Sequence, residues 1–241
     1  MVCLFLWFPS LNFGFACGTN TETQWSFDAQ TEKAYRLVLN LDLDGAHQMI
    51  PDPQTVHQHY VIALAEALEL LITEDGEQYV EFEDRFTQRL ERRTRTNIPD
   101  DLFLQAEIRM HWAFVYIKFG HEFDAALNLR QAYLTIKSIK EKFPNFQAVK
   151  KTSGLLEVVI GSVPQKYNWV LSLLNMEGST QTGIKELESI CAPGSPFAFE
   201  ANLLLALIQG FLLQRPDEGL YEIKKILSVY PDNRLALFLG S

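Results

Sequence analysis

The spacing of apolar residues is the feature that most limits how this chain can fold. From Phe27 onward, apolar side chains recur every three or four residues, and no segment shows the strict alternation and Gly/Asn turns of a β-hairpin. Proline and glycine interrupt the pattern at short intervals, as at Pro51, Gly120 and Pro144. Short breaks make consecutive helices antiparallel neighbours. The sequence therefore predicts an all-α fold.

The apolar stripes also indicate where the individual helices lie. The clearest helices are expected over 27–41, 45–50, 54–73, 79–90, 99–119, 122–143, 197–213 and 217–229. Pro99 followed by Asp100 and Asp101 is a helix start, because proline tolerates the first turn and acids suit the positive end of the helix dipole. Seven of the eight residues from 112 to 119 are apolar, so this segment should be covered on several sides.

Composition excludes several classes of protein. The chain has 241 residues, of which 47% are hydrophobic, so it can bury a sizeable core. Its net charge of −9 gives no general attraction to nucleic acid or to an anionic membrane. The three cysteines, Cys3, Cys17 and Cys191, form neither a disulfide framework nor a metal-spaced pair. Nucleic acid is therefore not expected as a partner.

The first residues form a separate apolar segment. Residues 2–16 carry no charge and are too few for a membrane span of about 20 residues, but they have the length of a signal-peptide core. Gly14 and Ala16 place small residues before a cut ahead of Cys17, which would also be the acceptor of a lipid anchor. The first basic residue is Lys33, so the basic start of a leader is missing.

Two interpretations of this segment remain open. In the first, 1–16 is a signal peptide, 17–26 a linker and 27–241 the helical domain of an exported protein. Such a protein would be periplasmic or outer-membrane associated if bacterial, and it would touch a membrane only through a lipidated Cys17. In the second, the segment is buried against the domain of a cytoplasmic protein. In the first interpretation Cys3 is removed and Cys17 is removed or modified, so Cys191 is the only free thiol and no disulfide is expected.

A longer periodicity resembles the tetratricopeptide (TPR) repeat. The matching positions are Tyr116, Gly120, Phe123, Ala132 and Pro144. The small residues at two of them would let the helices of a hairpin approach closely. The segment from 197 to 231 repeats the scheme with a shorter turn. The resemblance implies a TPR-like α-α superhelix of stacked antiparallel helix hairpins, the alternative being a helical bundle without repeats.

A narrower resemblance lies in residues 153–184. Gly161 and Pro164, followed by Trp169 and Gly178, resemble a segment shared by the inclusion-body clearance family of TPR-like proteins, and residues 35–46 resemble the opening of its bacterial relatives. This resemblance implies a non-enzymatic interaction scaffold. It transfers no catalytic residue, because the matching positions are structural.

The histidines do not form a metal motif. His57 and His59 point apart on a helix, whereas helical metal pairs are four residues apart. Glu107 and His111 have that spacing but lack a third ligand nearby in the sequence. No P-loop, Rossmann or nucleophile-elbow motif occurs. We therefore assign no catalytic residue, metal or cofactor.

One basic cluster is a candidate for partner binding. It contains Arg85, Arg89, Arg92 and Arg93. It is either a solvated helix end with pairs such as Glu81 to Arg85, or a patch that binds an acidic segment of a partner. The aromatic residues Trp112, Tyr116, Tyr167 and Trp169 are expected in the core.

Two functions of different class follow. The chain is either a scaffold that binds a protein or peptide segment in a concave groove, or a helical enzyme or small-ligand binder that uses histidine and carboxylate groups. Residues 235–239 are all apolar and do not resemble a polar cap. We expect a further repeat or a partner to cover this end.

Overall fold

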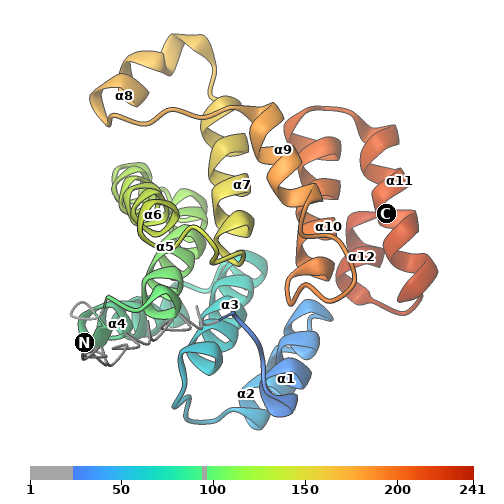
Figure 1. Cartoon of the computed structure of the whole chain (residues 1–241). Coiled ribbons are helices and arrows are strands. Elements are labelled where there is room, and N and C mark those ends of the chain that lie inside the picture. The colour runs from blue at the N-terminus through green and yellow to red at the C-terminus, as the bar shows by residue number, and fades with distance from the viewer. Residues whose placement is uncertain (1–23, 94–96) are drawn as a thin grey trace, which may run out of the picture.

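Regular structure in the described residues, 24–93 and 97–241 of a computed structural model, is entirely helical (Figure 1). The helices are α1 (Ala29–Leu39), α2 (Leu43–Met49), α3 (Val56–Thr73), α4 (Gly76–Arg93), α5 (Pro99–Lys118), α6 (Glu122–Lys142), α7 (Val149–Gly161), α8 (Asn168–Leu173), α9 (Thr180–Glu188), α10 (Ala198–Leu207), α11 (Pro216–Val229) and α12 (Arg234–Leu239). A 3₁₀ turn, Gln165–Tyr167, precedes α8, and a π-helical turn, Ile208–Leu212, continues α10. The all-α prediction is confirmed for these residues.

Local signals explain where several helices begin. Asp28 caps α1 by accepting a hydrogen bond from the Thr31 amide, and Thr55 forms a capping box with Gln58 at the start of α3. Pro99 occupies the first turn of α5, as the sequence predicts. These helix starts are local features, so they can be predicted without knowing the tertiary structure.

The helices pack in pairs, and the last helices of the chain return to the first one. Helix α5 packs against α6, α7 against α9, and α10 against α11. The C-terminal helices α10 to α12 return beside α1 (Figure 1). The Asn233 side chain donates to the Leu39 carbonyl at 3.0 Å, and the Arg234 amide donates to Asn40 Oδ1 at 3.0 Å. We call these two hydrogen bonds the α1–α12 clasp.

Glycines allow α7 and α9 to approach closely. A Cβ atom on Gly183 would lie 2.3 Å from the Gly154 carbonyl oxygen, and one on Gly161 would lie 2.6 Å from the Thr180 amide nitrogen. A Cβ on Gly178 would meet the Ile160 side chain. Gly161 and Gly178 therefore serve close backbone contacts, and this helix pair tolerates no larger residue at these positions.

Gly120 has a different role from the expected one. A Cβ atom there would meet nothing within 4 Å, so the residue does not serve a close approach of α5 and α6. Its φ of +80° is the reason for glycine, because a side chain disfavours this left-handed conformation. Ala132 is fully buried in α6, and Pro144 lies in the turn after α6.

Burial corrects the expectations for some aromatic residues. Trp112 and Tyr116 lie in the core as predicted, but Trp169 is 67% exposed on α8 and Phe123 is 74% exposed at the start of α6. The Tyr167 side chain lies outside the described part of the structure. Trp25, which is predicted to lie in a linker, is only 2% exposed among core side chains. The domain therefore includes Trp25, which hydrophobic periodicity missed because it precedes α1.

The C-terminal helix is partly covered. Ala236 is buried against the body of the molecule, and α12 packs on α11. Leu237 and Phe238 point to solvent, so an apolar surface remains at this end. Among the described helices, none is both long and apolar enough to cross a membrane.

Candidate functional site

Five helices bring polar side chains together inside the molecule. Tyr35 comes from α1, Tyr60 from α3, Glu107 from α5, Lys151 from α7 and Glu200 from α10. All five residues are buried. We call this cluster the polar centre. It joins helices that are far apart in the sequence, so it can form only when the whole fold is assembled.

The Lys151 ammonium is the hub of the polar centre. It donates to Glu200 Oε1 at 2.7 Å and to the Tyr60 hydroxyl at 2.8 Å, and it forms an ion pair with Glu107. Three protons and three acceptors satisfy the ammonium completely. Its Nζ atom also lies 4.9 Å from the ring centroid of Tyr60 and 5.0 Å from that of Phe197, within the range of cation–π contacts.

Glu200 receives hydrogen bonds from two tyrosines. The Tyr35 hydroxyl donates to its Oε2 atom at 2.5 Å, and the Tyr60 hydroxyl donates to the same atom at 2.8 Å. Burial alone would raise the pKa of Glu200, but Lys151 and the two hydroxyls hold it below its usual value. Burial and the nearby carboxylate raise the pKa of both tyrosines well above 10, so they remain hydrogen-bond donors.

Glu107 and His111 occupy the other side of Lys151. Burial raises the pKa of Glu107 to about 7, although Lys151 opposes this shift. Thr152 donates a hydrogen bond to the second carboxylate oxygen of Glu107. Burial and then Lys151 lower the pKa of His111 to about 3, so its imidazole is neutral near pH 7. Its Nε2 atom lies 3.6 Å from Glu107 Oε2.

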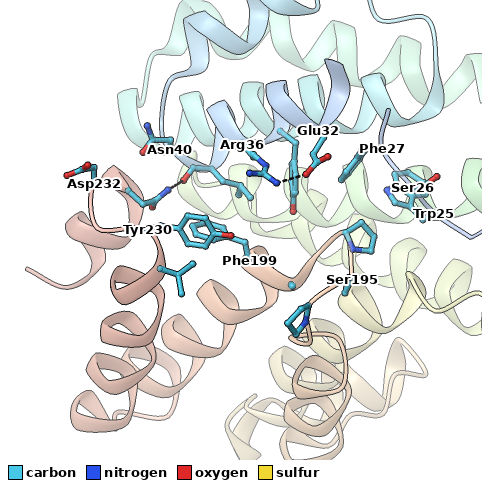
Figure 2. Close-up of a pocket in the computed structure, with 18 of the residues that line it drawn as sticks. Trp25, Ser26, Phe27, Glu32, Arg36, Asn40, Ser195, Phe199, Tyr230 and Asp232 are labelled. Carbon is cyan, nitrogen blue, oxygen red and sulfur yellow. Dashed lines mark hydrogen bonds and ion pairs between the residues drawn. The ribbon is translucent and has the colours of Figure 1, made fainter. Parts of the chain in front are cut away.

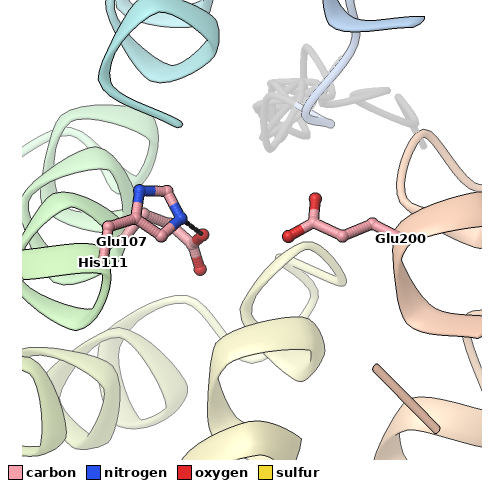
Figure 3. Close-up of side chains that lie close together, drawn as sticks. All are labelled: Glu107, His111 and Glu200. Carbon is pink, nitrogen blue, oxygen red and sulfur yellow. Dashed lines mark ion pairs between the residues drawn. The ribbon is translucent and has the colours of Figure 1, made fainter. Parts of the chain in front are cut away.

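Glu107 and His111 have a third possible metal ligand nearby in the fold, although none lies near them in the sequence. This residue is Glu200. Ligand atoms of the three residues lie within 4.8 Å of one another, and Figure 3 shows Glu200 reaching from α10 toward the α5 pair. The Lys151 ammonium bonds to both carboxylates and so occupies the position between them. Because burial would lower the pKa of Lys151 but the two carboxylates raise it, the lysine stays charged and serves as their counter-ion.

A groove lies beside the polar centre. It has a volume of about 970 Å³ and runs between α1, the loop 193–196 before α10, and the segment that links α11 to α12 (Figure 2). Its apolar lining includes Trp25, Phe27, Tyr35, Leu39, Pro193, Pro196, Phe199, Val229, Tyr230 and Pro231. Its polar lining includes Gln24, Ser26, Glu32, Arg36, Asn40, Ser195, Asp232 and Asn233.

The polar centre and the clasp hold the walls of this groove. Tyr35 lines the groove from α1, while its hydroxyl bonds to Glu200 on α10. The clasp joins α1 to the start of α12, and its members Asn40 and Asn233 line one end of the groove. The groove therefore lies between helices that are fixed to each other by hydrogen bonds. Such preorganisation lowers the entropic cost of binding a ligand.

No family model matches the chain, and no curated protein or solved structure matches it either. The groove and the polar centre are thus the features of the molecule that indicate its function.

The arginine cluster is largely engaged with buried or neighbouring carboxylates. Glu66 is completely buried in α3 and forms ion pairs with Arg89 and Arg85, the second at 3.1 Å. Arg85 also pairs with Glu81, as the i, i+4 spacing predicts. Arg89 is therefore a structural residue that neutralises Glu66. Arg92 and Arg93 lie at the end of α4, and their side chains fall outside the described part of the structure.

Sequence reasoning missed Lys151, Glu200 and Glu66. Glu66 and Glu200 are each the one charged residue in a mostly apolar stretch, residues 60–68 and 197–208, whereas Lys151 lies among the polar residues Lys150, Thr152 and Ser153. A single charge on the apolar face of a helix is a signal for a buried ion pair, because an unpaired charge would be too costly there. The partner of each charge comes from a distant helix and is not marked in the sequence.

Proposed function

We propose that this protein is a non-enzymatic TPR-like scaffold that binds a segment of a partner protein in the groove between α1, α10 and α12. The observation that carries the proposal is the groove itself. It has a volume of about 970 Å³ and is lined by aromatic and proline side chains, with polar groups among them. Surfaces of this kind bind extended peptides.

The engagement of the polar centre supports a scaffold over an enzyme. A catalytic lysine, glutamate or histidine needs access to a substrate. Lys151 and Glu107 are buried and hydrogen-bonded to protein partners, so they contribute to the stability of the groove walls. The second candidate, a helical ligand binder using His111 and the carboxylates, would have to displace the Lys151 ammonium from its two counter-ions.

The proposal extends to fold family and location. The hairpins α5–α6 and α10–α11, with the close glycine contacts of α7 and α9, support a TPR-like arrangement similar to that of the inclusion-body clearance family. The apolar segment 2–16 ahead of Cys17 supports export of the protein, with the helical domain acting outside the cytoplasm.

A groove-filling variant tests the scaffold function. Ser195 lines the groove, so Ser195→Trp should fill it, whereas Ser228→Trp places the same side chain on the exposed surface of α11. Each serine donates or accepts one side-chain hydrogen bond with nearby backbone, so the two variants lose comparable local contacts. Purified wild type and both variants are used to capture partners from an extract of the source cells, and the captured proteins are identified by mass spectrometry.

We expect a defined set of proteins to bind wild type and Ser228→Trp but not Ser195→Trp. Equal capture by all three proteins would contradict binding in the groove. Circular dichroism on each variant checks that it remains helical before the comparison is made.

A further inference from the structure

The charges along the groove do not balance. Arg36 Nη2 donates to Glu32 Oε1 at 2.6 Å, so these two side chains neutralise each other (Figure 2). Asp232 also lines the groove but makes no hydrogen bond or ion pair with any residue in the described part of the chain. The groove therefore presents one uncompensated negative charge.

Aromatic surface lines the same end of the groove as this charge. Tyr230 precedes Asp232 by two residues and is 44% exposed. Its ring packs edge to face on Phe199, with centroids 4.9 Å apart and an interplanar angle of 85°. An exposed ring at the same end of a groove as an unpaired carboxylate suits a lysine or arginine side chain, whose aliphatic stem packs on the ring while its charged end reaches the carboxylate.

The two ends of the groove differ. Asp232 and Asn40 lie at one end, and Trp25 and Phe27 lie at the other (Figure 2). The second end carries these two aromatic side chains together with the polar Gln24 and Ser26, and it adjoins the proline-containing loop 193–196. A ligand with a cation at one end and apolar residues at the other would therefore bind in the groove in one orientation only.

The net charge of the protein favours the same class of partner. At −9, the chain attracts cationic segments over distances of about 10 Å, the screening length at 0.1 M salt. An acidic or neutral peptide would gain nothing from this field. The local and the overall charge thus point to a basic partner.

We propose that the groove binds an extended basic peptide segment, with a lysine or arginine at the Asp232 and Tyr230 end and apolar or proline residues at the Trp25 and Phe27 end. This inference rests on the proposed scaffold function and specifies the chemistry of its partner.

Two labelled peptides of equal length test the charge preference. Both contain the same run of leucine and proline, and one ends in two arginines while the other ends in two glutamates. Binding to the full-length protein is followed by fluorescence anisotropy at 50 mM and 300 mM NaCl. We expect the arginine peptide to bind more tightly, and its advantage to shrink at the higher salt concentration.

Charge reversal at Asp232 provides the decisive comparison. Asp232→Lys should weaken the arginine peptide by about tenfold and strengthen the glutamate peptide, because it replaces attraction with repulsion. Asp84→Lys changes the net charge equally on the exposed face of α4, away from the groove, and should leave the preference unchanged. Asp232→Asn should weaken the arginine peptide by about threefold, as expected for an exposed ion pair.

The outcomes separate this inference from the scaffold function. Equal binding of the two peptides, no binding of the arginine peptide at millimolar concentration, or equal effects of Asp232→Lys and Asp84→Lys would overturn the basic-peptide inference. The scaffold function would still stand if Ser195→Trp alone abolished partner capture. It would fail if Ser195→Trp captured the same partners as wild type.

Discussion

The Nζ atom of Lys151 lies 2.7 Å from Oε1 of Glu200, and this contact joins α7 to α10 inside the protein. The same ammonium is bound to Glu107 of α5, and Glu200 is bound to tyrosines of α1 and α3. One buried pair therefore connects five helices. Removing one partner of such a pair leaves the other charge buried without compensation.

Glu200→Gln should strongly destabilise the protein. The substitution removes a charge but little volume, so the loss measures electrostatics rather than packing. We expect the free energy of unfolding to fall by about 3–5 kcal/mol, measured by urea denaturation. Glu188→Gln, on the exposed surface at the end of α9, should change it by no more than about 0.5 kcal/mol. Similar small changes in both variants would mean that Lys151 does not depend on Glu200.

His111 should make the protein less stable in acid. The pKa of His111 in the folded protein is about 3, below its ordinary value of 6.5. Between pH 6.5 and pH 3 the unfolded chain therefore binds a proton that the folded chain does not. The free energy of unfolding should fall as the pH falls through this range. Glu107 has the opposite sign. Its folded pKa of about 7 lies above 4.5, so the folded chain binds the extra proton and stability rises as the pH falls from 7 to 4.5.

His111→Gln isolates the histidine contribution. Urea denaturation of wild type and variant at pH 7 and pH 4 gives the difference in their unfolding free energies at each pH. For each pH unit below 6.5, the free energy of unfolding of wild type should fall by about 1.4 kcal/mol relative to that of the variant. A difference that does not change with pH would show that the imidazole is not held neutral in the folded protein.

Gly183→Ala should disrupt the contact between α7 and α9. The added methyl group would lie 2.3 Å from the Gly154 carbonyl oxygen and 2.8 Å from the Val158 amide nitrogen, and backbone atoms cannot move aside easily. We expect a loss of about 1–3 kcal/mol or more in urea denaturation. Gly76→Ala is the control, because its methyl group would meet nothing within 4 Å. Equal stability of the two variants would contradict the close helix contact.

Export should remove the first sixteen residues. The apolar segment 2–16 and the small residues Gly14 and Ala16 predict cleavage before Cys17. Intact-mass analysis of the protein purified from its source cells should find a mature chain that starts at Cys17, with added mass if that cysteine carries lipid. A soluble cytoplasmic protein that retains Met1 would contradict export.

Local sequence signals predicted where the helices lie, but they did not predict which distant helices pack against each other. The expected helix over 122–143 corresponds to α6, Glu122–Lys142. This helix could be predicted because its apolar periodicity and the proline that ends it are both local features of the sequence. The bond between Tyr35 and Glu200 spans 165 residues, and no local pattern marks it. Trp169 was predicted to be buried because its side chain is apolar. It lies on the short helix α8 and is 67% exposed, so apolar character alone does not determine burial.

The candidate site was less predictable than the fold. The groove contains Trp25, from a segment assigned to a linker, together with loop residues such as Ser195 and Asp232 that have no periodicity. The sequence predicted a groove-binding scaffold as a class, but the position of the groove follows from the return of α10 to α12 beside α1. Spatial closure of this kind is a tertiary property.

The clasp between α1 and α12 has a consequence for the order of folding. In an open repeat array each unit contacts only its neighbours, so units can fold one after another during synthesis. Here the Leu39 carbonyl receives its clasp hydrogen bond from Asn233, 194 residues later. Closing so long a loop carries an entropic cost before the contact forms, which slows folding. Helix α1 should thus reach its final protection from hydrogen exchange only when α10 and α12 dock, which would make assembly of the groove the last step of folding.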